Sequence, residues 1–138
     1  DFKNIVGIKE ASGDFGQIMQ ILNERPAGFQ VYSGDDLLTL PMLAAGADGV
    51  ISVIANGCPA EFSQMTRHAL AGDFAAARTL HYRLLPLMQL IFAEGNPTGI
   101  KALLHARGLV QNELRLPMVS ASAALNEKIA SYLKTAGL

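Results

Sequence analysis

The sequence predicts an α/β fold in which three parallel strands alternate with helices and a helical C-terminal region follows. Two observations predict this fold. Short apolar runs rich in Val and Ile alternate with segments of helical periodicity as far as residue 54, and only helical patterns follow Asn56. Apolar strands with short helical connections are typical of a parallel sheet. We therefore divide the chain into a strand–helix part, residues 1–72, and a helical part, residues 73–138.

The expected strands cover residues 5–9, 29–33 and 49–54, which are short and mostly apolar. Asp14 is a suitable N-cap for the first helix, because its carboxylate can accept the free amides of the first helical turn. A second helix is expected over residues 37–45. The first half of the chain is therefore expected to run strand, helix, strand, helix, strand.

The second half of the chain predicts four helices. The first covers residues 60–71, and the second carries an apolar stripe together with Pro86, which should kink that helix or mark a turn. Asn96 is expected to cap the third helix, with the following proline at its first position and Gly108 just after its end. The last helix ends near Gly137.

The composition excludes several classes of protein. Of 138 residues, 50% are apolar and 17% are charged, which is too apolar for a disordered chain. A net charge of −1 offers no basic face for nucleic acid or for an anionic membrane. A single cysteine, Cys58, excludes a disulfide framework, and the three histidines lack the spacing of metal ligands, so we expect no metal site. With no visible signal peptide and no apolar run long enough to span a bilayer, we expect a cytoplasmic protein.

Lys9 does not fit its apolar surroundings in the first strand. Alternation along a strand places Gly7 and Lys9 on one face and Glu10 on the other, so Glu10 is poorly placed to neutralise the amine. We expect Lys9 to point into a core or a cavity, where loss of hydration favours the neutral form of the amine. A neutral amine is a nucleophile that forms a Schiff base with a carbonyl compound. The alternative is a lysine that reaches solvent or pairs with a carboxylate of another segment.

A short repeat follows the first two strands. Ser12–Asp14 and Ser33–Asp35 are both Ser-Gly-Asp, in which glycine permits a tight turn and aspartate can cap the next helix. Both copies are expected at the carboxyl ends of strands, which is where parallel α/β folds bind their ligands.

Five strings in order identify a family resemblance. They are Gly7–Gly13, Ser33–Asp36, Gly46–Val53, Glu94–Pro97 and Leu116–Met118. Together they resemble the dihydrodipicolinate synthase family over essentially all of the chain. The resemblance implies a partial (β/α)₈ TIM barrel, with its last three strand–helix units in residues 1–72 and the C-terminal helical region in residues 73–138. It also implies a homotetramer or a dimer.

The resemblance implies a lyase of lysine and diaminopimelate biosynthesis. In the family, the lysine at position 9 condenses with pyruvate, and the resulting enamine attacks aspartate-4-semialdehyde to give 4-hydroxy-tetrahydrodipicolinate, without a cofactor. Ile51 falls on the position whose main chain contacts pyruvate, and Gly34 on a position that lines the same pocket. Asp35 and Asn96 fall on positions at the pocket entrance, although each could instead serve as a helix cap.

Other functions remain open at this stage. An N-acetylneuraminate lyase or a keto-deoxy-sugar-acid aldolase shares the Schiff-base lysine with the dihydrodipicolinate synthases. A non-catalytic half-barrel, acting as an association module, is an alternative of another class. The family's threonine motif, its proton-relay tyrosine and its substrate-gripping arginine have no counterpart in these residues, so we expect the isolated chain to be inactive as a synthase.

Overall fold

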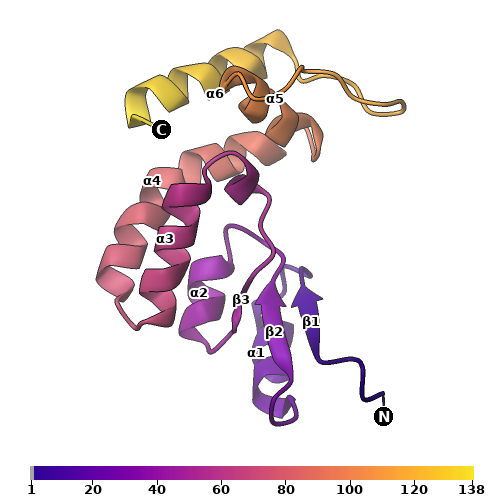
Figure 1. Cartoon of the computed structure of the whole chain (residues 1–138), viewed down its shortest axis with the longest axis vertical. Coiled ribbons are helices and arrows are strands. Elements are labelled where there is room, and N and C mark those ends of the chain that lie inside the picture. The colour runs from indigo at the N-terminus through magenta and orange to yellow at the C-terminus, as the bar shows by residue number, and fades with distance from the viewer. Residues whose placement is uncertain (1) are drawn as a thin grey trace.

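A computed structural model describes residues 2–138 and shows, within them, a three-stranded parallel sheet joined to a helical region (Figure 1). The strands are β1 (Gly7–Glu10), β2 (Gln30–Ser33) and β3 (Gly49–Val50). The helices are α1 (Phe15–Glu24), α2 (Thr39–Ala44), α3 (Pro59–Leu70), α4 (Phe74–Phe92), α5 (Thr98–Ala106), α6 (Ala123–Ala136) and the short 3₁₀ helix η1 (Ile54–Asn56). The strand order β1-β2-β3, parallel throughout, confirms the predicted alternation of strands and helices.

The third strand is shorter than the sequence predicts. It ends at Val50 rather than continuing to Ile54. The amides of Val53 and Ile54 donate to the Asp36 carboxylate, at 3.2 and 2.8 Å, and so are not available to a sheet. A carboxylate from the loop after β2 therefore turns the chain out of the sheet directly after the third strand.

The helix ends test the predicted caps. Asp14 caps α1 as expected, since its carboxylate accepts the amides of Gly16 and Gln17. The prediction that Asn96 caps α5 is wrong. Helix α5 begins at Thr98, so Pro97 is the cap residue and Asn96 lies in the preceding loop.

Two further predictions concern helix geometry. Gly108 and Gly137 follow α5 and α6 with φ of 72° and 61°, in the left-handed region that ends helices at glycine. Pro86 does not mark a turn, because α4 continues through it to Phe92.

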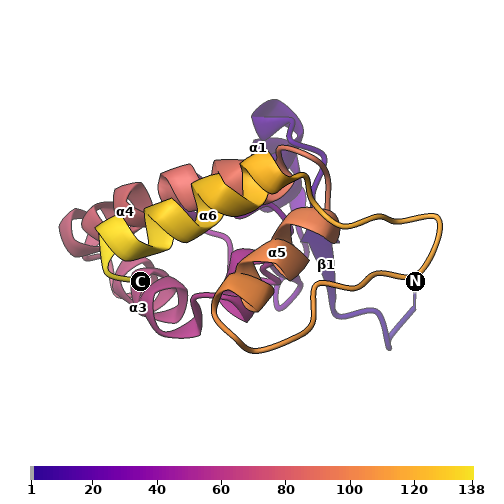
Figure 2. The ribbon, with the colours of Figure 1, turned by 90° about the horizontal axis from the view of Figure 1, so that it is seen from above.

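The hydrophobic core runs from one face of the sheet into the helical region. Helices α2, α3 and α4 lie to one side of the strands in Figure 1, and β1 forms the opposite edge. Seen from above, α6 lies beside α4 and α5 (Figure 2), and it contacts both. The largest fully buried side chains are Phe62, Ile18, Met42, Ile54, Met65, Leu84, Leu87, Met88, Ile91, Leu103, Ile129 and Val31. No helix within residues 2–138 is both long and apolar enough to cross a membrane.

His81 on α4 makes stability depend on pH. The side chain is buried, its Nδ1 has no hydrogen-bond partner within residues 2–138, and burial lowers its pKa from the ordinary 6.5. As pH falls, the unfolded chain therefore binds the proton first, and stability is lost progressively below about pH 6.5. We expect His81→Gln to flatten the loss of the thermal unfolding midpoint between about pH 7 and about pH 5.

The control for this prediction is His105→Gln, which alters an exposed histidine. It should leave the pH dependence of the midpoint close to that of the wild type. A His81→Gln protein whose midpoint falls with pH as steeply as the wild-type midpoint would contradict the assignment.

Candidate active site

The two faces of the sheet have different environments. Along β1, Glu10 is 4% exposed and lies on the side covered by helices, whereas Lys9 is exposed on the other side. In the register of the sheet, Lys9 on β1 lies opposite Tyr32 on β2, and Tyr32 lies opposite Gly49 on β3. These three residues therefore project from the same side of the sheet. Two residues further along each of the last two strands, Gly34 and Ile51 come to the same side.

Lys9 is not buried in this part of the protein. The prediction that it points into a core or cavity is wrong for residues 2–138, because three strands form an open surface and no opposite wall closes over the amine. The prediction that Glu10 projects away from Lys9 is confirmed. The ion pairs found within residues 2–138 are Arg25–Asp48 and His68–Asp73, so no carboxylate of this region holds the Lys9 ammonium.

Gly34 packs directly against the lysine. A methyl group at position 34 would lie 2.9 Å from Cε of Lys9, 2.7 Å from Cβ of Ala11 and 3.1 Å from the carbonyl oxygen of Glu10. These distances are shorter than non-bonded carbon atoms tolerate. The amide of Gly34 also donates to the Glu10 carbonyl at 2.7 Å. Glycine is therefore needed at position 34, because the Lys9 side chain occupies the space that a side chain at position 34 would fill.

Ile51 follows the last residue of β3 and is anchored to the neighbouring strand. Its amide donates to the Ser33 carbonyl at 2.8 Å, and its side chain is 51% exposed. The amide is thus occupied, which leaves the Ile51 carbonyl as the main-chain group that can meet a ligand. The structure brings Lys9, Gly34 and Ile51 to the carboxyl end of the same open face.

Asp35 lies in the same loop as Gly34, but its carboxylate has a structural partner. Oδ1 accepts the amides of Leu37 and Leu38, at 2.8 and 3.1 Å, in the turn that leads into α2. The side chain is only partly buried. The helix-cap role that the sequence offers for Asp35 is therefore wrong, because α2 begins at Thr39 with Leu38 as its cap residue, and the Asp35 carboxylate instead holds the turn before the helix.

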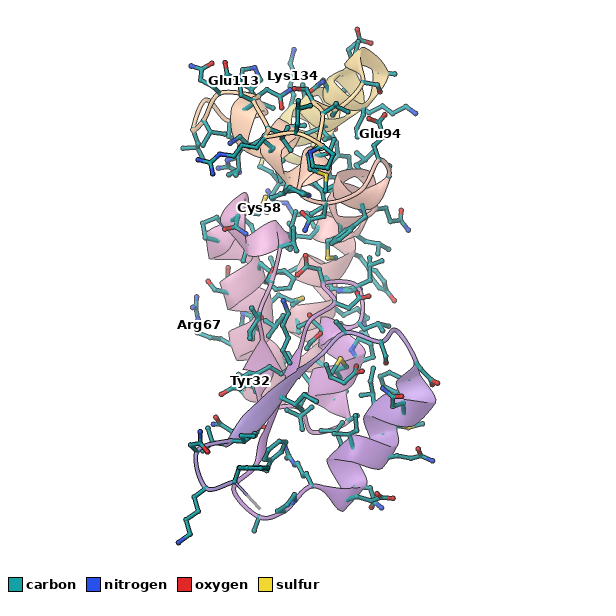
Figure 3. All side chains as sticks on the ribbon, turned by 90° about the vertical axis from the view of Figure 1, so that its right-hand side faces the viewer. Tyr32, Cys58, Arg67, Glu94, Glu113 and Lys134 are labelled. Carbon is teal, nitrogen blue, oxygen red and sulfur yellow. The ribbon has the colours of Figure 1, made fainter. Side chains whose placement is uncertain are left out.

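Asn96 comes from the helical part of the chain, whereas the other predicted site residues come from the strands and the loops that follow them. It is exposed in the loop between α4 and α5, and no hydrogen bond within residues 2–138 joins it to them. Glu94 anchors this loop by accepting the amide of Ser122 at 2.8 Å and the hydroxyl of the same residue. These bonds from Ser122 lower the pKa of Glu94. Glu94 lies at the helical end of the molecule and Tyr32 at the sheet end (Figure 3).

Cys58 is fully buried, as an ordinary core thiol would be. Burial raises the pKa of the thiol, so the reactive thiolate is disfavoured.

Asp36 is a buried residue of this region that the sequence did not predict as part of the site. Its side chain is 2% exposed, and its carboxylate accepts amides from the loop that follows β3. Burial raises the pKa of Asp36, while hydrogen bonds from Ser52, Ile54 and Val53 oppose that change. The signal available in the sequence was a second aspartate directly after Asp35, since one turn needs only one carboxylate.

A comparison with known families decides the relationship. Residues 1–136 match the sequence profile of the Dihydrodipicolinate synthetase family. The chain belongs to this family. The resemblance drawn from the five sequence strings is thereby confirmed.

Similar proteins agree with the family assignment. The chain is 52% identical over 133 residues to 4-hydroxy-tetrahydrodipicolinate synthase of Phocaeicola vulgatus, covering 96% of this chain and 45% of that protein. The crystal structure of dihydrodipicolinate synthase from Thermotoga maritima superposes with a TM-score of 0.95 at 41% identity, over 99% of this chain and 48% of that one.

A third similar protein was crystallised with a ligand. It is a chloride-inhibited dihydrodipicolinate synthase from Acinetobacter baumannii complexed with pyruvate, with a TM-score of 0.94 and 36% identity over 99% of this chain and 47% of that one. The chain therefore spans about half the length of the family members that it matches.

Proposed function

We propose that this chain carries the Schiff-base lysine of a 4-hydroxy-tetrahydrodipicolinate synthase. Lys9 is the nucleophile, the Ile51 main chain contacts pyruvate, Gly34 lines the pocket, and Asp35 and Asn96 lie at its entrance. The observation that supports the proposal best is the placement of Lys9, Gly34 and Ile51 on one open face at the carboxyl ends of the strands. Parallel α/β folds place their active sites at these ends.

The chemistry needs only the amine and a means of proton transfer. The neutral Lys9 amine adds to the keto carbon of pyruvate, and water leaves to give a protonated imine. This imine withdraws electrons, so a proton is lost from the pyruvate methyl group and an enamine forms. The enamine carbon then bonds to the aldehyde carbon of aspartate-4-semialdehyde. Attack by the substrate's own amine on the imine carbon closes the ring and releases Lys9.

We propose that this chain is part of a complete (β/α)₈ barrel. Residues 1–72 would supply the last three strand–helix units of a (β/α)₈ barrel, and residues 73–138 the helical region that follows it. Exposed apolar side chains at and before β1 support this arrangement, since Phe2, Ile5, Val6 and Ile8 are 71%, 57%, 62% and 40% exposed. Further strands across the open face would also enclose the Lys9 amine. We propose a cytoplasmic homotetramer or dimer.

The substrate test uses the full-length gene product with pyruvate and two acceptors. We expect turnover with aspartate-4-semialdehyde and none with N-acetylmannosamine. The opposite result would assign the protein to the sugar-acid lyases, and turnover with neither acceptor would overturn the proposed reaction.

We expect the isolated 138-residue chain to be inactive as a synthase. The open face leaves Lys9 exposed to water, and residues that would relay protons are not supplied. The measurement is aldol turnover by the purified chain, alone and mixed with the remaining part of the gene product. Full turnover by the chain alone would contradict the half-barrel proposal.

A further inference from the structure

We infer that Asp36 is a positioning residue for the keto acid: its buried carboxylate fixes the loop after β3 and, through it, the main chain of Ile51. The inference rests on the proposed role of Ile51 in binding pyruvate. It assigns to the second aspartate of the Ser-Gly-Asp-Asp loop a task different from that of Asp35, which holds the turn before α2.

The carboxylate binds the segment directly after Ile51. Its Oδ2 accepts the Ile54 amide at 2.8 Å, and both oxygens lie 3.2 Å from the Val53 amide. The Ser52 side chain also acts on this carboxylate, since it opposes the rise in the pKa of Asp36. Two consecutive backbone amides therefore donate to one side chain that is 2% exposed. Hydrogen bonds to an ionised acceptor are shorter and stronger than neutral ones, so this contact defines the path of the loop.

Ile51 is thereby held on both sides. Before the loop, its own amide is fixed to the Ser33 carbonyl at 2.8 Å. After it, Asp36 holds the amides of residues 53 and 54. A main-chain carbonyl between two such anchors keeps one orientation, and pre-ordered groups of this kind bind a ligand without a further cost of ordering.

The segment that carries Asp36 is itself rigid. The hydroxyls of Ser33 and Thr39 each donate to the Asp35 carbonyl at 2.8 Å, and both side chains are fully buried. One residue earlier, the Gly34 amide is bonded to the Glu10 carbonyl, next to Lys9. Asp36 therefore ties the loop of Ile51 to the same unit that carries Gly34 and contacts the lysine.

The test compares two Asp→Asn variants in the full-length gene product. Asp36→Asn leaves one acceptor oxygen and turns an amide group toward backbone donors. We expect the KM for pyruvate to rise about tenfold with a smaller change in kcat, because ground-state binding is what the loop supplies. Borohydride should still trap pyruvate on Lys9 at saturating pyruvate. Amide hydrogen exchange at residues 51–54 should become faster.

Asp73→Asn is the matched control. Asp73 caps α4 by accepting the Ala76 amide at 3.0 Å, outside the strand ends that carry the site. This variant loses the same kind of bond and should keep the wild-type KM for pyruvate. A general loss of stability would lower the unfolding temperature of both variants, but it would not raise KM in one alone.

Ser52→Ala is the second variant, which removes the side chain that acts on Asp36 and accepts the Ala55 amide at 2.9 Å, and which leaves the Asp36 carboxylate in place. We expect it to raise the KM for pyruvate by a smaller factor than Asp36→Asn. If Asp36→Asn does not fold, the KM of Ser52→Ala tests the inference. An unchanged KM in the folded variants overturns the inference. If instead wild-type protein forms no trapped pyruvate adduct, the proposed function fails, which is a distinct result.

Discussion

Replacing Lys9 by alanine in the full-length gene product is expected to abolish the borohydride-trapped pyruvate adduct. The variant has no side-chain nitrogen at position 9, so neither the imine nor the enamine can form there. We expect kcat to fall by roughly 10⁴-fold or more, in the range found when a covalent nucleophile is removed. Mass spectrometry of the trapped protein and steady-state turnover with aspartate-4-semialdehyde measure the two effects.

Lys3→Ala provides the control for this experiment. Lys3 is an exposed lysine six residues before Lys9, and its loss should change neither the adduct nor the turnover. If the Lys9→Ala protein still forms the adduct in wild-type amount, another amine reacts and Lys9 is not the nucleophile.

The second large effect is expected at Gly34. In Gly34→Ala the new methyl group would lie 2.7 Å from Cβ of Ala11 and 2.9 Å from Cε of Lys9. Because the Ala11 backbone is fixed beside β1, the flexible lysine side chain is the group that moves. We expect adduct formation with pyruvate to slow by roughly 10²-fold, as happens when a reacting group is displaced by about 1 Å. Such overpacking should also destabilise the fold by roughly 1–3 kcal/mol.

Gly16→Ala is the matched substitution. It adds the same methyl group in the first turn of α1, where it meets only the Asp14 carboxylate, at 3.1 Å. We expect wild-type rates of adduct formation from this variant. Wild-type rates from Gly34→Ala as well would show that the contact with Lys9 does not hold the amine in place.

The parts of the fold that follow from local chemistry could be predicted from the sequence. Asp14 caps α1 by accepting amides of the first helical turn, which lie only two and three residues further along the chain. A contact this local can be predicted from the sequence. The opposite projection of Lys9 and Glu10 follows from the period of a strand. Gly108 ends α5 because only a residue that accepts positive φ fits there.

The remaining features depend on contacts between distant segments. The length of β3 is set by Asp36, 17 residues before Val53, which no pattern within the strand records. The start of α5 is set by Pro97 rather than by Asn96, whose polar side chain gave the stronger cap signal. The environment of Lys9 depends on whatever covers the open face, and the three strands described here cannot provide it.

The location of Gly34 could be predicted, but the physical cause that requires glycine there could not. The family resemblance places it beside the pocket, and glycine there could have served a turn with positive φ. The structure instead gives Gly34 no positive φ and crowds it against Lys9. The restriction is thus steric and comes from the nucleophile itself.

The most direct test of the account is to map the pyruvate adduct on the wild-type full-length gene product. After borohydride reduction and proteolysis, tandem mass spectrometry should find a carboxyethyl group on the peptide that contains Lys9, and on that lysine alone. Modification of Lys3, Lys101 or another amine with Lys9 left unmodified would contradict it, as would the absence of any adduct at saturating pyruvate.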